Sequence, residues 1–395
     1  MKTVYVGMSG GVDSSVSAML LVEQGYHVVG VYMKNWSEDL PGMKCPWAED
    51  LADAKRVAVK LGIDFKVWDF EKEYREKVVE HMLAEFRAGN TPNPDIMCNQ
   101  EIKFKLFYEK AMAAGADFIA TGHYARIGFE SNLQEASMSH SGPRPAGPSP
   151  RAAGANSRAA ALRNAPSRNI DASCKSPHHP PMLLRAVDEN KDQTYFLYRI
   201  SQEALEHTLF PIGEMKKPEV KKLAKEHGLH NAYKKESMGV CFVGEVGMKD
   251  FLKKYIEMEP GEIREMESNR VLGYHEGAVF YTLGQRHGLY LASDLPFYVV
   301  KKDVKNNIIY VSKDLNNREL WTKELKLKDV FMRQLSHDDA LETTVLVRLR
   351  HRAPLIPARF DGKTLSFEQE IKRPASGQSA VIYDGEICPG GGIIA

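Results

Sequence analysis

Two cysteines of this sequence lie where a thiol could be made reactive. The first, Cys98, lies in "GNTPNPDIMCNQEIKF", in which Pro92 and Pro94 restrict the backbone and Asp95 could cap a following helix. That cap would put Cys98 in the first helical turn, where the positive end of the helix dipole lowers a thiol pKa towards the thiolate form. A small buried cysteine near a helix start is an equally good interpretation of this stretch.

The second cysteine, Cys241, lies in "KKESMGVCFVGE", which has the character of a loop. Lys234 and Lys235 precede it, and their charge would favour the thiolate. Its apolar neighbours Val240 and Phe242 favour a packed cysteine instead. Neither cysteine by itself therefore establishes a reactive site.

The stretch "YVGMSGGVDSSV", residues 5–16, has the composition of an anion-binding turn. A short β-rich run ends at Ser9, Gly10 and Gly11, and Asp13 and Ser14 are residues that begin helices. A glycine-rich turn leading into a helix gathers backbone N–H groups around one point, which favours phosphate. The alternative is an ordinary strand-to-helix turn, and the Gly-Lys-Ser/Thr ending of a Walker loop is missing. The hydroxyls, the carboxylate and the paired glycines favour a pyrophosphate site.

The hexapeptide "SGGVDS" resembles the signature loop of the PP-loop ATP pyrophosphatases. That resemblance implies cleavage of ATP between its α- and β-phosphates and adenylation of a carbonyl oxygen. An adenylated oxygen is a leaving group that a sulfur nucleophile can displace. Two cysteines would suffice for such a transfer, because one could hold a persulfide while the other attacks to release the sulfur and close a transient disulfide.

Length and composition indicate a globular enzyme of two or three domains. The chain has 395 residues, of which 43% are hydrophobic and 27% charged, with a net charge of +1. A nucleic-acid surface would therefore have to be local. No apolar run reaches the roughly 20 residues of a membrane span, and the N-terminus has the pattern of a core strand rather than a signal peptide. We expect a cytoplasmic protein with no membrane partner.

The cysteine spacing argues against a structural metal. Five cysteines form no CxxC pair, so neither a disulfide scaffold, structural zinc nor a cysteine-held iron–sulfur cluster is expected. Magnesium is expected only beside ATP, whose phosphates it would neutralise. Cys45, Cys174 and Cys388 receive no predicted role.

Strands and helices alternate through the first part of the chain. Strands are predicted near 3–8, 28–33, 65–70 and 117–124, and helices at 51–61, 71–87 and 102–114. This alternation predicts an α/β fold with a parallel sheet covered on both faces, and ligands beyond the C-terminal strand ends. The resemblance adds that the domain is of the PP-loop (adenine nucleotide alpha hydrolase-like) type.

The rest of the chain changes character twice. Residues after Tyr195 have helical patterns, and from Val271 onward the chain is β-rich, with alternation in "TTVLVRLR" and "SAVIYDGEI". We therefore expect a PP-loop catalytic domain at 1–205, a small central linking domain at 206–285 and a C-terminal β-barrel-like domain at 286–395, a sandwich being the alternative.

Residues 130–181 differ from everything around them. They are rich in Pro, Ala, Gly, Ser and Arg, with five arginines and no acidic residue between Ala136 and Ile170. Such a composition cannot bury a core, which predicts a disordered insertion. Its positive charge could touch RNA, although a tolerated expansion of a surface loop is the favoured interpretation.

The full set of motifs resembles one family, the bacterial tRNA-specific 2-thiouridylases, over almost the whole chain apart from the insertion. The matching stretches run in the family's order: "GMSGGVDSSV", "YMKNW", "TPNPDIMCNQEIKF", "TGHYAR", "KDQTYFLYRI", "FPIGE", "ESMGVCFVGE", "YTLGQRHGL", "SGQSAVIYDGE" and "CPGGGII". The resemblance implies ATP-dependent thiolation of the wobble uridine (U34) of tRNAs for Lys, Glu and Gln, with sulfur from a persulfide donor or relay protein. The base would have to leave its stack to present the C2 oxygen.

The resemblance also implies a role for individual residues. Cys98 would be the nucleophile, Cys241 would carry the persulfide, and Asp95 would hydrogen-bond the base or exchange a proton with it. The residues implied to bind ATP are Gly7, Met8, Ser9, Gly10, Gly11, Val12, Asp13, Ser14, Met33 and Gly122. The residues implied to meet the flipped-out base are Asn93, Pro94 and Asp95. The residues implied to contact tRNA are His123, Lys191, Asp192, Gln193, Arg350, His351 and Gln378. The last three of these belong to the C-terminal domain, which the resemblance implies to be tRNA-binding.

Several of these positions have simpler interpretations. His351 stands where the family has a tyrosine, and His123 could be a satisfied loop histidine. Without the resemblance, residues 191–193 would be interpreted as a solvated charged turn. The basic clusters 216–217, 221–222 and 348–352 could engage phosphates or could equally be solvated faces.

Three other functions remain compatible with parts of the sequence. A PP-loop ligase acting on a small molecule, like argininosuccinate or NAD synthetase, would need no cysteine pair. An RNA-binding module that has lost catalysis predicts a degraded loop, whereas the "SGGVDS" stretch is complete. A cluster-dependent thiolase is disfavoured by the missing CxxC. Oligomeric state and the purpose of the insertion are not predicted.

Overall fold

The computed structural model describes residues 1–39, 45–129, 180–235, 247–333 and 343–395. Cys174, Cys241 and nearly all of the insertion at 130–181 lie outside the described residues. Within the described ranges, no helix is long and apolar enough to cross a lipid bilayer.

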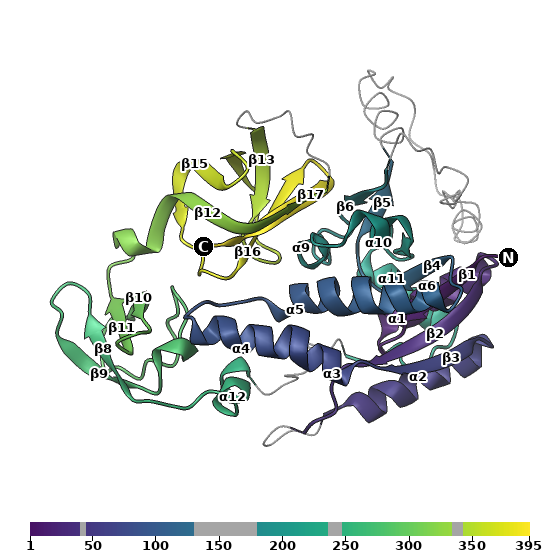
Figure 1. The fold of residues 1–395 in the computed structure, drawn as a ribbon, viewed down its shortest axis with the longest axis horizontal. Coiled ribbons are helices and arrows are strands. Elements are labelled where there is room, and N and C mark those ends of the chain that lie inside the picture. Colours follow the sequence, from purple (N-terminus) through teal and green to yellow (C-terminus); the bar gives the residue numbers. More distant parts are fainter. Residues whose placement is uncertain (40–44, 130–179, 236–246, 334–342) are drawn as a thin grey trace, which may run out of the picture.

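A five-stranded parallel sheet forms the N-terminal part of the molecule (Figure 1). Its spatial order is β3-β2-β1-β4-β7, and every neighbouring pair is parallel. The chain runs outward from β1 to β3 and then continues on the other side with β4 and β7, so the order reverses between β1 and β4. Ligands in open parallel sheets bind beyond the strand ends at such a point. The strands are β1 (Thr3–Gly7), β2 (His27–Lys34), β3 (Asp64–Asp69), β4 (Phe118–Thr121) and β7 (Thr208–Leu209).

Helices cover both faces of this sheet, as the alternating pattern predicted. Val4 and Val6 of β1 are buried in one hydrophobic cluster, whereas Tyr5 between them belongs to another. The side-chain period of two in a strand explains this division. The first cluster packs against α1 (Val12–Glu23), α2 (Trp47–Leu61) and α11 (Lys217–Glu226). The second packs against α3 (Glu71–Tyr74), the π-helical η1 (Arg75–Val79), α4 (Glu80–Arg87), α5 (Pro94–Met97), the π-helical η2 (Cys98–Phe107) and α6 (Tyr108–Ala113).

The middle part of the sequence forms a small sheet of order β10-β11-β8-β9. In Figure 1 this sheet lies at the end of the molecule farthest from the N-terminus. The β11–β8 pair is parallel, and the other two pairs are antiparallel. Its elements are α12 (Met248–Lys253), β8 (Gly261–Glu265), β9 (Val271–His275), η3 (Ala278–Phe280), β10 (Tyr298–Asp303) and β11 (Ile308–Ser312).

The C-terminal strands close into a barrel, which confirms the barrel-like prediction. They run in the order β12-β15-β14-β13-β16-β17, and β12 also pairs with β17, so the sheet has no free edge at that seam. The elements are η4 (Arg318–Leu320), β12 (Trp321–Met332), β13 (Thr343–Arg348), β14 (Ile356–Phe360), β15 (Thr364–Lys372), β16 (Ser379–Asp384) and β17 (Ile387–Ile394).

A hairpin from the N-terminal part extends the barrel sheet. Its strands β5 (Arg126–Gly128) and β6 (Met182–Leu184) flank the insertion, and Leu184 pairs with Ile387 of β17. The chain then continues through α9 (Thr194–Leu197) and α10 (Gln202–Glu206) to β7. The domain boundaries at 205 and 285 stay predictions.

Candidate functional site

The turn after β1 brings three polar groups to one point at the start of α1. The Ser9 hydroxyl lies 3.3 Å from the Ser14 hydroxyl, and the Gly11 N–H donates to the Ser9 oxygen at 3.4 Å. Gly10 has a φ of +75°, and a Cβ there would lie 2.4 Å from the carbonyl oxygen of Asp50. Only glycine satisfies both conditions. The arrangement of N–H and hydroxyl donors at a helix N-terminus is suited to bind an anion.

A buried cation neutralises the carboxylate of this turn. The Lys217 ammonium donates to both carboxylate oxygens of Asp13, at 2.6 and 2.7 Å, and the Tyr124 hydroxyl donates to one of them at 3.1 Å. Lys217 is the first residue of α11 and is only 7% exposed. Lys217 was predicted only as part of a basic cluster, and Tyr124 was missed.

The other residues predicted to bind ATP also adjoin the turn. Gly122 follows β4, and a Cβ on it would lie 2.6 Å from the Ser14 backbone nitrogen. A Cβ on Gly7 would lie 2.9 Å from the terminal methyl group of Met33, at the end of β2. The structure therefore brings residues 7–14, Met33 and Gly122 together at the C-terminal strand ends.

Asn93, not Asp95, caps the helix that leads to Cys98. The Asn93 side-chain oxygen accepts hydrogen bonds from the backbone N–H groups of Asp95 and Ile96, at 3.1 and 3.4 Å. Pro94 occupies the first helical position, where a missing N–H costs nothing. The prediction that Asp95 is the cap was wrong, because the proline places the helix start two residues earlier. Cys98 consequently lies beyond the first turn.

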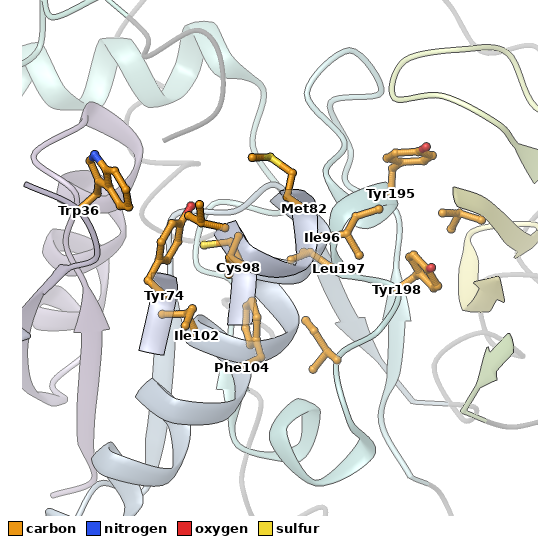
Figure 2. Close-up of a cluster of buried hydrophobic side chains, with 14 of the residues drawn as sticks. Trp36, Tyr74, Met82, Ile96, Cys98, Ile102, Phe104, Tyr195, Leu197 and Tyr198 are labelled. Carbon is orange, nitrogen blue, oxygen red and sulfur yellow. The ribbon is translucent and has the colours of Figure 1, made fainter. Parts of the chain in front are cut away.

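Cys98 is packed in a hydrophobic cluster. It is 2% exposed and begins the π-helical η2, among Tyr74, Ile96 and Ile102 (Figure 2). A π-helical segment is rare and is frequently found at functional sites. Burial raises the pKa of Asp95, one turn before Cys98, and the charge of Lys103 opposes that rise. A carboxyl group with a raised pKa is suited to hold or transfer a proton.

The segment that leads towards Cys241 is anchored beside the anion-binding turn. The Asn231 amide donates to the Gly10 carbonyl and to the Ser15 hydroxyl, both at 2.9 Å. Lys234 pairs with Asp50 at 2.8 Å and with Asp53 at 2.6 Å, so its charge is met by α2. Asn231 was missed because nothing near it in the sequence is a recognisable partner.

The stretch Lys191-Asp192-Gln193 attaches the barrel to the N-terminal part. Asp192 is 1% exposed and accepts a hydrogen bond from the Arg348 guanidinium at 2.7 Å. The Gln193 side-chain oxygen accepts from the Tyr124 backbone N–H at 2.9 Å. This stretch is therefore not a solvated turn in the structure, although Lys191 retains partial exposure.

His123 is a buried histidine close to the same strand end. Its Nδ1 lies 2.8 Å from the Thr121 hydroxyl, and its ring contacts those of Phe104 and Phe210. Burial, with a smaller effect from Lys103, holds the pKa of His123 well below its usual value. The ring is therefore neutral near pH 7 and does not present a cation.

The three barrel residues predicted to contact tRNA differ in exposure. Arg350 is exposed. The His351 ring packs against Phe196 at a tilt of 45° with ring centres 4.5 Å apart, and burial together with Arg352 and Arg348 lowers its pKa to about 4. The Gln378 amide donates to the Thr91 carbonyl at 2.6 Å, just before the Asn93 cap.

The two remaining described cysteines are poor nucleophiles. Burial raises the pKa of Cys388 to about 12 and also raises that of Cys45. Among the residues that the structure describes, no group of three or more histidine, cysteine, aspartate and glutamate side chains could hold a metal ion.

Comparison with known proteins covers the chain in three segments. A family model described as "tRNA methyl transferase HUP domain" matches residues 2–142 and 172–245. Models described as "tRNA methyl transferase PRC-barrel domain" and "Aminomethyltransferase beta-barrel domain" match residues 249–313 and 322–394. The first spans the parallel sheet, the second the middle sheet and the third the closed barrel.

Two curated relatives align over the full chain. The tRNA-specific 2-thiouridylase MnmA of Pseudomonas syringae pv. syringae (strain B728a) is 42% identical over 402 residues, covering 100% of this chain and 94% of its own. That of Pseudomonas fluorescens (strain SBW25) is 41% identical over 401 residues, with the same coverage. A solved NMN synthetase from Francisella tularensis is 17% identical, is matched over 30% of this chain and 44% of its own, and has a TM-score of 0.22.

Proposed function

This chain belongs to the family of tRNA-specific 2-thiouridylases, and from that membership we propose that it is a tRNA-uridine 2-sulfurtransferase. It would use ATP to activate the C2 oxygen of the wobble uridine and would replace that oxygen with sulfur. The structural observation that carries the ATP step is the convergence of the Ser9 and Ser14 hydroxyls with the Gly11 N–H at the start of α1.

In the first step, the uridine C2 oxygen attacks the α-phosphorus of ATP and pyrophosphate leaves. The turn at 7–14 would hold the phosphates with its N–H and hydroxyl donors, and Met33 and Gly122 would border the nucleotide. Lys217 would supply a positive charge beside the leaving pyrophosphate. Magnesium would arrive with ATP and would neutralise part of the charge of its phosphates.

In the second step, the outer sulfur of a persulfide on Cys241 bonds to C2 of the adenylated base. The Cys98 thiolate attacks the inner sulfur of Cys241, a disulfide forms between the two cysteines, and AMP leaves with the former C2 oxygen. Asp95 would take up or return the proton of the base, which agrees with its raised pKa. A cellular thiol must then reduce the disulfide, and a persulfide donor or relay protein must reload Cys241.

The RNA would lie across the junction of the barrel and the N-terminal part. Asn93 and Pro94 would contact the flipped-out base beside Asp95. Exposed Arg350 is best placed to meet a phosphate, whereas His123, Asp192 and Gln378 would act by holding the surfaces in place. Since Cys98 is buried in the RNA-free protein, tRNA binding would have to uncover it.

The decisive experiment is a single-turnover sulfur transfer with ATP, magnesium, a persulfide source and unmodified tRNA. Wild type would be compared with Cys98→Ser and Cys241→Ser, and with Cys174→Ser as a control outside every predicted site. Mass spectrometry of the digested RNA would separate 2-thiouridine from a methylated base.

The proposal requires product from wild type and the control, and none from the two catalytic variants. ATP cleavage with unmodified RNA in every sample would refute the tRNA assignment. In that case a PP-loop ligase acting on a small molecule would be the better explanation.

A further inference from the structure

The Gly10–Gly11 peptide decides whether the anion-binding turn offers a donor or an acceptor to a phosphate. A trans peptide points its carbonyl and its N–H in opposite directions. In the structure the Gly10 carbonyl points away from the cluster of hydroxyls and accepts from Asn231, while the Gly11 N–H points towards Ser9. Rotation of this peptide would place an oxygen where a phosphate oxygen must bind.

Asn231 fixes that orientation from a distant part of the chain. Its side chain is 3% exposed, and both amide N–H bonds are used, one to Gly10 and one to the Ser15 hydroxyl of α1. Ser15 in turn donates to the Gly11 carbonyl at 2.9 Å. The amide therefore bridges the turn and the first helical turn, and it leaves its own oxygen buried without a partner among the described residues.

Side-chain contacts with α2 flank Asn231 on both sides. His230 Nε2 lies 3.1 Å from Asp53, and the Lys234 ammonium group pairs with Asp50 at 2.8 Å and with Asp53 at 2.6 Å. The backbone carbonyl of Asp50 in α2 lies so close to Gly10 that a Cβ on Gly10 would be 2.4 Å from its oxygen. The asparagine is thus anchored on both sides to α2, which itself contacts the turn.

We propose that Asn231 is a positioning residue for ATP: it sets the Gly10–Gly11 peptide so that its N–H faces the nucleotide phosphates. This inference rests on the proposed ATP-dependent function. Losing the amide donor leaves the Gly10 carbonyl buried and unpaired, which favours rotation of the peptide towards the phosphate position.

The test measures the dissociation constant of the magnesium complex of α,β-methylene ATP for wild type, Asn231→Asp and Asn231→Ala. At about pH 8 an aspartate carboxylate cannot donate, so we expect binding to be weakened about tenfold or more in both variants. At about pH 6 a buried aspartate facing two oxygens takes up a proton and can donate again, so Asn231→Asp should recover most of the loss while Asn231→Ala should not. A role in packing alone would not produce this recovery.

Other titratable groups surround the turn, namely His230, Lys234, Asp50, Asp53, Asp13 and Lys217. Their effects on the dissociation constant are present in wild type as well, so each variant is compared with wild type at the same pH. Tyr233→Ala changes an exposed side chain of the same segment and should bind like wild type.

Binding of Asn231→Asp within about twofold of wild type at pH 8, or an equal loss at both pH values, would overturn the inference. If Asn231→Asp does not fold, Asn231→Ala at pH 8 decides the question by the same criterion. Wild type that fails to bind the analogue would instead remove the proposed ATP site, and the inference with it.

Discussion

The ammonium group of Lys217 lies 2.6 and 2.7 Å from the two carboxylate oxygens of Asp13, although 204 positions separate the residues in the chain. One is at the start of α11 and the other at the start of α1, and the two helices pack together on the same face of the sheet. The pair therefore places one positive and one negative group beside the predicted phosphate position.

Replacing Lys217 with methionine should slow the release of pyrophosphate from ATP, which reports the adenylation step. Loss of one electrostatic stabiliser of a transition state costs about 100- to 1000-fold in rate, so we expect the adenylation rate to fall about 100-fold or more. The Asp13 carboxylate would also be left to repel the phosphates. Lys221→Met, on the exposed face of the same helix, is the matched control and should change the rate less than about twofold. A Lys217→Met enzyme with the wild-type rate would show that the cation is only structural.

Gly122→Ala should weaken nucleotide binding because the new methyl group meets the start of α1. Its Cβ would lie 2.6 Å from the Ser14 nitrogen and 2.8 Å from the Asp13 carbonyl carbon. Overpacking of this kind costs about 1–3 kcal/mol, so calorimetric titration with an ATP analogue should detect weaker binding. Gly247→Ala, where a Cβ meets nothing within 4 Å, should leave affinity unchanged. Equal affinities for both variants would contradict the close approach.

The sequence was sufficient to predict the parallel sheet and the anion-binding turn, because both signals are local. The continuous apolar run of β1 predicts a strand that is buried on both faces of the sheet. The glycines and hydroxyls of "SGGVDS" all lie within six residues. The helix cap near Cys98 was assigned to the wrong residue because Asn93 and Asp95 are both good caps, and only the position of Pro94 separates them.

Long-range partners could not be predicted. Asp192 has the sequence context of a charged turn, yet it is buried against Arg348, which lies 156 residues later. The β5–β6 hairpin gives no local sign that it pairs with the last strand of the barrel. Asn231 and Lys217 acquire their partners only when distant helices pack on the sheet.

Breaking the Asp192–Arg348 pair should loosen the attachment of the barrel. The pair is buried on both sides, with side-chain exposures of 0% and 6%, so Asp192→Asn leaves a buried guanidinium without its charge partner. Loss of one partner of a buried pair costs about 3–5 kcal/mol in the free energy of unfolding, measurable by urea titration. The exposed pair Lys222–Glu226 supplies the control, since Glu226→Gln should change that free energy by less than about 0.5 kcal/mol.

The affinity for tRNA provides a second measurement on the contact region between the barrel and the N-terminal part. Arg350→Ala should weaken tRNA binding without changing stability, because the side chain is exposed. Asp192→Asn should lower stability and leave the affinity of the folded fraction close to wild type. A wild-type stability with lost tRNA affinity in Asp192→Asn would instead favour direct contact of Asp192 with the RNA.

His351 should make the protein less stable in acid, and a tyrosine at this position should remove that effect. Burial and the neighbouring Arg352 and Arg348 lower its folded pKa to about 4, whereas an unfolded histidine titrates near 6.5. Below the pKa of the unfolded chain, His351 binds a proton in the unfolded chain but stays unprotonated in the folded protein. The stabilising contribution is therefore complete above about pH 6.5 and is lost as the pH falls towards 4. As the pH falls over this range, the urea midpoint of His351→Tyr should rise progressively relative to that of wild type. The contributions of His123 and the carboxylates to the difference cancel, because both proteins contain these groups. His287→Tyr, at an exposed position, is the control, and a difference for His351→Tyr that does not change with pH would refute the packed, neutral ring.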